Sequence, residues 1–103
     1  MTLGMRIIAR KTLREFWERP NRRDAEQSLK AWFREAERAD WANPAQLKAD
    51  FRNASIVAND RVVFNIAGNK YRLVVHVHWA VRIMYIRFIG THREYDAIDV
   101  GKV

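Results

Sequence analysis

The chain has 103 residues, of which 49% are hydrophobic, with four glycines, two prolines and no cysteine. This composition is that of one globular domain over residues 1–103, and it excludes a disordered chain, thiolate catalysis and cysteine-based zinc sites. The formal net charge is +7. Residues 51–103 carry eight basic and four acidic side chains. This balance is typical of proteins that bind a polyanion, above all nucleic acid. Two alternatives stay open: binding to a membrane surface, or a charge that serves solubility and has no partner.

No apolar run approaches the roughly 20 residues that a membrane-spanning helix needs. Residues 1–11 are too short and too interrupted by charge for a signal peptide. We therefore expect a cytoplasmic protein with no membrane association.

The first elements predicted along the chain are a strand and a helix. Residues 5–9 are apolar and partly β-branched, which favours a short strand. Residues 12–19 place apolar side chains three and four positions apart, which predicts a helix that Pro20 ends.

Two further helices follow. The longer one begins at Asn21 or at Asp24, and Asp24 has capping-box spacing with Gln27. Its apolar stripe comprises Ala25, Leu29, Trp32, Phe33 and Ala36. Asn43-Pro44 predicts the start of a third, short helix, because it combines an N-cap with a proline at the first helical position. Residues 51–57 then favour a short strand or an extended segment.

The second half of the chain predicts antiparallel strands. Gly68-Asn69 separates two β-prone runs by two residues, which is typical of a hairpin and sets Asn65 opposite Arg72. A second turn near residues 80–81 sets three further pairs, Val77 with Met84, Val74 with Arg87 and Arg72 with Ile89.

Because side chains alternate along a strand, these registers predict two unlike faces. The apolar face comprises Val62, Phe64, Ile66, Tyr71, Leu73, Val75, Val77, Trp79, Met84, Ile86 and Phe88. The other face comprises Val63, Asn65, Lys70, Arg72, Val74, His76, His78, Ile83, Tyr85, Arg87 and Ile89. We expect helices on the apolar face and a cationic face left open to a negatively charged partner.

A short C-terminal helix is predicted directly after the last strand. Thr91 and Glu94 have capping-box spacing, which makes His92 the first helical residue. Helix N-termini have free N–H groups that favour an anion. Strand pairing brings this helix near Lys70 and Arg72, so two cations, an imidazole and a helix N-terminus should converge, with no carboxylate nearby. The predicted fold is α+β, with N-terminal helices packed on a small, twisted, mainly antiparallel sheet.

The order and spacing of these segments resemble the HigB-type toxins of bacterial toxin–antitoxin pairs, a branch of the RelE-like ribonucleases. The resemblance covers nearly the whole chain. Its most specific pieces are Phe64-Asn65, Gly68-Asn69, Tyr71-Arg72, Tyr85-Ile86-Arg87, Thr91-His92-x-Glu94-Tyr95-Asp96, and Asp40-Trp41 followed by Asn43-Pro44.

The resemblance implies an enzyme that cleaves messenger RNA on the ribosome, by metal-free attack of the ribose 2′-OH and without a cofactor. It also implies a HigA-like helix-turn-helix antitoxin as partner. Catalytic roles carry over to Arg72, His92 and Tyr95. Further RNA contacts are expected from Asn65, Lys70, His76, Arg87 and Arg93. The chain has fewer strand lysines than the RelE pattern, so the identity of the general base stays open.

Two alternatives accompany this interpretation. His76 and His78 lie on one strand face, where a metal site can begin, but no carboxylate follows on that face to complete it. The sequence also fits a non-catalytic module that binds nucleic acid or protein through the same basic face.

Overall fold

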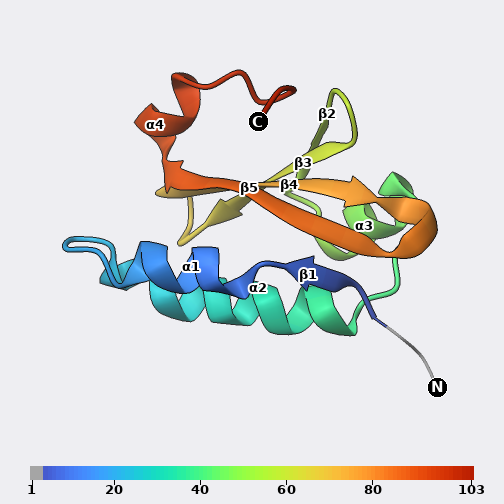
Figure 1. Ribbon diagram of the computed structural model, residues 1–103, viewed down its shortest axis with the longest axis horizontal. Helices are drawn as coiled ribbons and strands as arrows, with labels where there is room; N and C mark the ends of the chain where they lie inside the picture. Colours follow the sequence, from blue (N-terminus) through green and yellow to red (C-terminus); the bar gives the residue numbers. More distant parts are fainter. Residues whose placement is uncertain (1–3) are drawn as a thin grey trace.

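The computed structural model describes residues 4–103. In this part of the chain, helices cover one face of a five-stranded sheet, which confirms the α+β class (Figure 1). The elements in chain order are β1 (Arg6–Ile8), α1 (Arg10–Trp17), the 3-10 turn η1 (Arg23–Ala25), α2 (Glu26–Arg38), α3 (Pro44–Asp50), β2 (Ser55–Val57), β3 (Arg61–Ile66), β4 (Tyr71–His78), the 3-10 turn η2 (Trp79–Val81), β5 (Ile83–Thr91) and α4 (His92–Asp96). No helix among the described residues is both long and apolar enough to cross a membrane.

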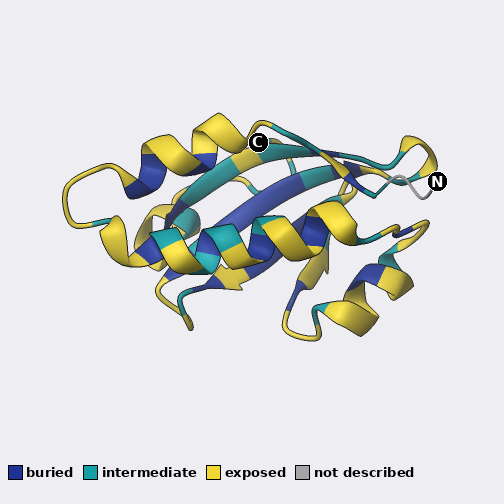
Figure 2. Cartoon of the chain, turned by 90° about the horizontal axis from the view of Figure 1, so that it is seen from below, coloured by how far each residue is buried: buried dark blue, intermediate teal, exposed yellow. Residues whose placement is uncertain are grey.

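The helices pack on the sheet through the apolar stripes that the sequence predicts. The side chains that α1 and α2 bury are Leu13, Phe16, Trp17, Leu29, Trp32 and Ala36. Figure 2 shows α1 and α2 with exposed outer faces and with buried residues turned toward the central strands. Aromatic rings connect the layers, because Phe16 meets Tyr71 edge-on at 5.3 Å and Trp32 meets Phe64 at 5.3 Å between ring centroids. This contact between helices and sheet forms the hydrophobic core.

The sheet has the strand order β1-β5-β4-β3-β2. β1 pairs in parallel with β5, and the remaining pairs are antiparallel. The predicted first strand therefore joins the sheet, which is mainly antiparallel as expected. The first hairpin has the predicted register, with Asn65 opposite Arg72.

The second hairpin has the predicted register only near its turn. Val77 lies opposite Met84 as expected, but Val74 lies opposite Phe88 and Arg72 opposite Gly90. A β-bulge at Val74/Val75 causes the difference. An additional residue on β5 shifts every later pair by one position, so the two expected pairs beyond it are wrong.

The bulge also exchanges the faces of two residues on β5. Ile89 packs against the hydrophobic core, whereas Phe88 is absent from that cluster and pairs with Val74. Phe88 was expected on the core face and Ile89 on the other. A one-residue shift reverses the direction of every later side chain, so both expectations are wrong.

The face of the sheet turned away from α1 and α2, which we call the outward face, is partly covered. Helix α4 and residues 97–103 cross it (Figure 1). Val63 and Val74 are buried, yet they lie outside the core that the helices cover. The Arg61 guanidinium donates to the main-chain oxygen of Val103 over 2.6 and 3.2 Å. The expectation of an open face is therefore wrong at this end, because two apolar side chains there are covered by the chain itself.

Two of the three predicted helix caps are confirmed. Asn43 Oδ1 accepts the Gln46 N–H over 3.0 Å, with Pro44 at the first helical position. Thr91 and Glu94 form a complete capping box at α4. Asp24 does not cap α2: the N-cap is Ala25, without a side-chain bond, because the Asp24 carboxylate is engaged elsewhere.

Candidate active site

The end of the sheet at the β3–β4 turn brings together several of the predicted site residues. Asn65 lies opposite Arg72 on neighbouring strands. The His92 N–H donates to the Lys70 carbonyl over 3.3 Å, which joins the start of α4 to the start of β4. We call Asn65, Lys70, Arg72 and His92 the turn corner.

Arg72 is held by main-chain oxygens and keeps part of its guanidinium free. Its Nη1 donates to the Asn69 carbonyl over 2.8 Å and to the Tyr71 carbonyl over 3.3 Å. The half-buried side chain makes no ion pair with any residue in 4–103. An arginine fixed in this way presents its remaining N–H donors in a plane, the geometry that suits two phosphate oxygens.

Lys70, in contrast, has a partner that the sequence did not predict. The Asp24 carboxylate forms an ion pair with Lys70 and accepts a hydrogen bond from the Tyr71 hydroxyl. The bond from Lys70, followed by that from Tyr71, lowers the pKa of Asp24. The expectation that no carboxylate lies at this corner is therefore wrong. Asp24 lies far away in the sequence, and only the packing of η1 against the sheet brings it there.

His92 begins α4 with its imidazole exposed. Its Nδ1 lies 3.4 Å from Asp96 Oδ2, one turn further along the helix. This orientation leaves Nε2 as the nitrogen directed away from the chain's own carboxylate.

Most of the main-chain N–H groups at the start of α4 already donate hydrogen bonds within the chain. Thr91 donates to Glu94 Oε1 over 2.8 Å, Glu94 to Thr91 Oγ1 over 3.1 Å, and His92 to Lys70. The chain itself therefore satisfies three of the donors that were expected to bind an anion at this helix N-terminus.

Tyr95 and Arg93 extend from α4 beside the turn corner. The Tyr95 ring packs against Phe88, with 6.4 Å between centroids and an interplanar angle of 53°. This contact depends on the bulge that places Phe88 on the outward face. Arg93 is exposed and forms no ion pair with a residue of the described range.

His76 and Arg87 lie in a separate group, which we call the histidine patch and which comprises His76, His78, Tyr85 and Arg87. The centroids of the two imidazole rings are 4.6 Å apart, and the guanidinium carbon of Arg87 lies 5.3 Å from the centroid of the Tyr85 ring. The patch is four residues along β4 from Arg72, about 13 Å at the usual rise of a strand. It is therefore distinct from the turn corner.

The imidazole of His76 is largely shielded from solvent. Its Nδ1 is buried without a hydrogen-bond partner among the described residues. Burial, followed by the positive charges of Arg61, His78 and Arg87, lowers the pKa of His76. Within residues 4–103, no three His, Cys, Asp or Glu side chains gather as metal ligands do.

Two arginines near the turn corner were not predicted from the sequence. Arg19 and Arg22, in the loop between α1 and η1, place their guanidinium carbons 5.6 and 5.9 Å from the centroid of the Phe16 ring. The pKa of Glu94 is lowered chiefly by the Thr91 N–H and, to a smaller extent, by the charges of Arg22 and Arg19. The loop therefore lies beside α4. The only local signal was the basic run at residues 19–23.

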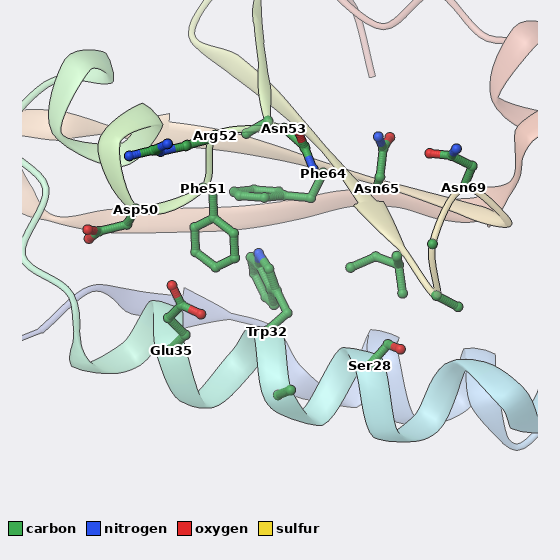
Figure 3. A pocket seen from close by; sticks show the side chains of 15 residues that line it. Ser28, Trp32, Glu35, Asp50, Phe51, Arg52, Asn53, Phe64, Asn65 and Asn69 are labelled. Carbon is green, nitrogen blue, oxygen red and sulfur yellow. The ribbon is translucent and has the colours of Figure 1, made fainter.

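A groove of about 680 Å³ opens next to the turn corner, between α2, residues 50–54 and the edge of β3 (Figure 3). Asn65 and Asn69 stand at the end of the groove nearest the corner, and Trp32 and Phe51 form its aromatic part (Figure 3). The Trp32 indole N–H is buried without a hydrogen-bond partner in the described chain. The groove widens the accessible surface beside Arg72, but its rings are too buried to offer an open stacking face.

The comparison with known families agrees with the geometry of this site. No curated protein matches the chain. A family model of the HigB toxin, the RelE-like toxic component of a toxin–antitoxin system, matches residues 25–98. The matched segment spans α2, α3, β2 to β5, the turn corner and all of α4. The chain therefore belongs to the HigB toxin family.

Proposed function

We propose that this toxin is an endoribonuclease that cleaves messenger RNA during translation on the ribosome, in the cytoplasm. The observation that supports the proposal is the turn corner, which combines Arg72, without an ion pair in residues 4–103, with His92, whose N–H bonds to the Lys70 carbonyl. RNA strand scission requires two functions, the binding of phosphate by a cation and the transfer of protons by an acid–base group.

Arg72 binds the scissile phosphate. Its Nη1 is anchored on the Asn69 carbonyl, so the guanidinium is positioned before substrate arrives. Its remaining donors then stabilise the negative charge that develops on the phosphate oxygens in the transition state. Lys70 has a smaller part, because Asp24 already offsets its charge.

The reaction is a transesterification. The ribose 2′-oxygen attacks the adjacent phosphorus, the bond from phosphorus to the 5′-oxygen breaks, and a 2′,3′-cyclic phosphate and a 5′-hydroxyl form. One proton leaves the 2′-oxygen and one reaches the 5′-oxygen. His92 transfers one of these through Nε2, while Asp96 holds Nδ1. The group that handles the other proton is not assigned. The reaction needs no metal, because no water or external nucleophile has to be activated.

The remaining residues position the RNA. Asn65 lies opposite Arg72, and Tyr95, on α4, packs against Phe88 of β5, so both can orient the nucleotide next to the scissile phosphate. Arg93 is exposed on the same helix. His76 and Arg87, in the histidine patch, contact the strand farther from the cleavage point.

The antitoxin partner that the family implies is proposed to be HigA-like, with a helix-turn-helix domain that binds DNA. Its toxin-binding part masks the cationic turn corner or prevents the toxin from entering the ribosome. Co-expression provides the test: the neighbouring antitoxin should copurify with the toxin and restore growth. A toxin that remains lethal beside a bound partner would contradict this assignment.

The cleavage proposal is tested with the Arg72→Ala, His92→Gln double variant on a ribosome-bound message. We expect cleavage to be lost, since general acid–base transfer alone is typically worth about 10²- to 10⁴-fold. The single variant Asp96→Asn should cause a smaller loss. Circular dichroism and thermal unfolding check that each variant is folded.

The chemical groups at the ends of the cleaved RNA distinguish metal-free cleavage from metal-dependent cleavage. Cleavage should persist in EDTA, at magnesium sufficient to preserve the ribosome, and leave a 2′,3′-cyclic phosphate or 3′-phosphate with a 5′-hydroxyl. A 5′-phosphate would indicate a metal-dependent route. Growth arrest without cut messages would support the non-catalytic binding module instead.

A further inference from the structure

The turn corner has less positive charge of its own than its residue types suggest. Lys70 is paired with Asp24, and His92 faces Asp96. Arg72 is the only member of the corner that is cationic and has no carboxylate partner in residues 4–103. A single-stranded RNA brings one phosphate with every nucleotide, so a site that holds several nucleotides needs further cations.

Such cations lie in the loop between α1 and η1. Figure 1 shows this loop, the β3–β4 turn and α4 at the same end of the molecule. Arg19 and Arg22 both approach the ring of Phe16, at 5.6 and 5.9 Å. Neither makes an ion pair with a residue that the structure describes. Arg22 Nε is buried and has no partner in this part of the chain.

The loop is fixed to the catalytic end of the sheet. Phe16 packs edge-on against Tyr71. The Tyr71 hydroxyl donates to Asp24, which lies two residues after Arg22 in the chain. Asp24 in turn pairs with Lys70, whose carbonyl accepts the His92 N–H. The two guanidinium groups are thereby held at a defined position relative to His92, against the planar ring of Phe16, which limits their freedom.

We propose that Arg19 and Arg22 form a second phosphate-binding subsite, which holds the backbone of the same messenger RNA one or more nucleotides away from the phosphate bound by Arg72. The inference rests on the proposed function and extends its substrate site beyond the residues named above. The unbonded N–H groups of the two arginines bind phosphate oxygens. RNA therefore passes over the end of the sheet, from the outward face to the helical layer.

The test compares two double variants with equal net charge. Arg19→Ala, Arg22→Ala removes the subsite, and Arg34→Ala, Arg38→Ala removes two exposed arginines of α2. The probe is a single-stranded RNA with 2′-O-methyl groups, which cannot be cleaved, and its affinity is measured by fluorescence anisotropy over a range of KCl concentrations. We expect about tenfold weaker binding for the first variant, with the salt slope reduced by roughly 0.7 for each lost phosphate contact. The control should bind as the wild type does.

A third variant, Arg19→Lys, Arg22→Lys, separates a charge effect from a packing effect on Phe16. It should retain most of the affinity and the salt slope. In cleavage of a ribosome-bound message, the alanine variant should require more enzyme to reach the half-maximal rate. We expect its rate at saturation to change less than threefold, which corresponds to roughly 0.6 kcal/mol or less of activation free energy.

Each outcome has one meaning. If the alanine variant binds and cleaves like its charge-matched control, the subsite does not exist. If the lysine variant fails as the alanine variant does while remaining folded, the arginines act through packing and the inference is overturned. A wild type that cuts translated messages but does not bind the probe refutes the subsite alone. A wild type that cuts no message refutes the proposed function.

Discussion

The outward face has two groups of basic and imidazole side chains, and they differ in what surrounds them. In the histidine patch, the neighbouring Arg61 donates to the oxygens of Val103 and Asn59, and His76 Nδ1 is buried. At the turn corner, Arg72 is anchored by one turn carbonyl and keeps further donors free. Arg72 of the turn corner and His76 of the histidine patch both lie on β4, about 13 Å apart by the usual strand rise.

This difference shows that a row of cations on a strand does not by itself define a binding site. The two groups look alike in the sequence, where both alternate with apolar residues. They differ in their surroundings: Arg61, which pairs with His76 across the strands, donates to the Val103 oxygen, so residues 97–103 reach the sheet beside the histidine patch. A cation whose donors are already bound to main-chain oxygens has less to offer an external phosphate.

The largest effect should come from comparing Arg72→Ala with Arg87→Ala. We expect Arg72→Ala to reduce mRNA cleavage about 10²-fold or more, because a preorganised donor to the transition-state charge is lost. Arg87→Ala should reduce it only a few-fold, through weaker RNA binding. Single-turnover cleavage of a ribosome-bound message measures both. Equal losses would mean that the two groups form one active site.

A smaller effect is expected from Arg61→Ala, measured by chemical unfolding and hydrogen exchange. Loss of the bonds to Val103 should lower the free energy of unfolding by about 1–2 kcal/mol and accelerate amide exchange in residues 97–103. Cleavage should change little. Arg34→Ala, which removes an exposed arginine of α2, is the matched control and should leave stability near that of the wild type. A loss of cleavage comparable with that of Arg72→Ala would place Arg61 in the active site.

The smallest effect concerns pH and His76. The ordinary pKa of histidine is 6.5, and burial, with the charges of Arg61, His78 and Arg87 opposed by Asp60, lowers it in the folded protein. As pH falls below 6.5, the unfolded chain binds the proton first, so His76 makes the protein less stable until the lowered pKa is passed. The free energy of unfolding should therefore fall as the pH is lowered through 6.5. His76→Gln should reduce this fall, and His78→Gln should reduce it less. If the free energy of unfolding changes equally with pH in the wild type and in both variants, the burial of His76 is contradicted.

The bulge on β5 marks where local patterns stop being sufficient. The register of the first hairpin was predicted correctly because Gly68-Asn69 marks the turn between the two strands. The second hairpin was correct at Val77 and Met84, next to its turn, and shifted beyond the bulge. Apolar residues occur on both sides of the bulge, so alternation alone did not show which of Phe88 and Ile89 faces the core.

The sequence by itself determined the features that depend on neighbours along the chain. These are the apolar stripes of α1 and α2, the Asn43 cap, the first hairpin, the capping box at Thr91 and the pairing that brings Asn65 opposite Arg72. Each follows from helical or strand periodicity, or from a hydrogen bond spanning three residues, so a short window of sequence contains the necessary information.

Only the tertiary structure decided which charges remain available at the site. Asp24 reaches Lys70 from another layer, the loop with Arg19 and Arg22 comes to lie beside α4, and residues 97–103 cover the face near Arg61. These contacts join segments that are distant in sequence, and their formation depends on how the layers pack. The physical reason is that electrostatic partnership depends on distance in space, whereas periodicity and capping depend on distance along the chain.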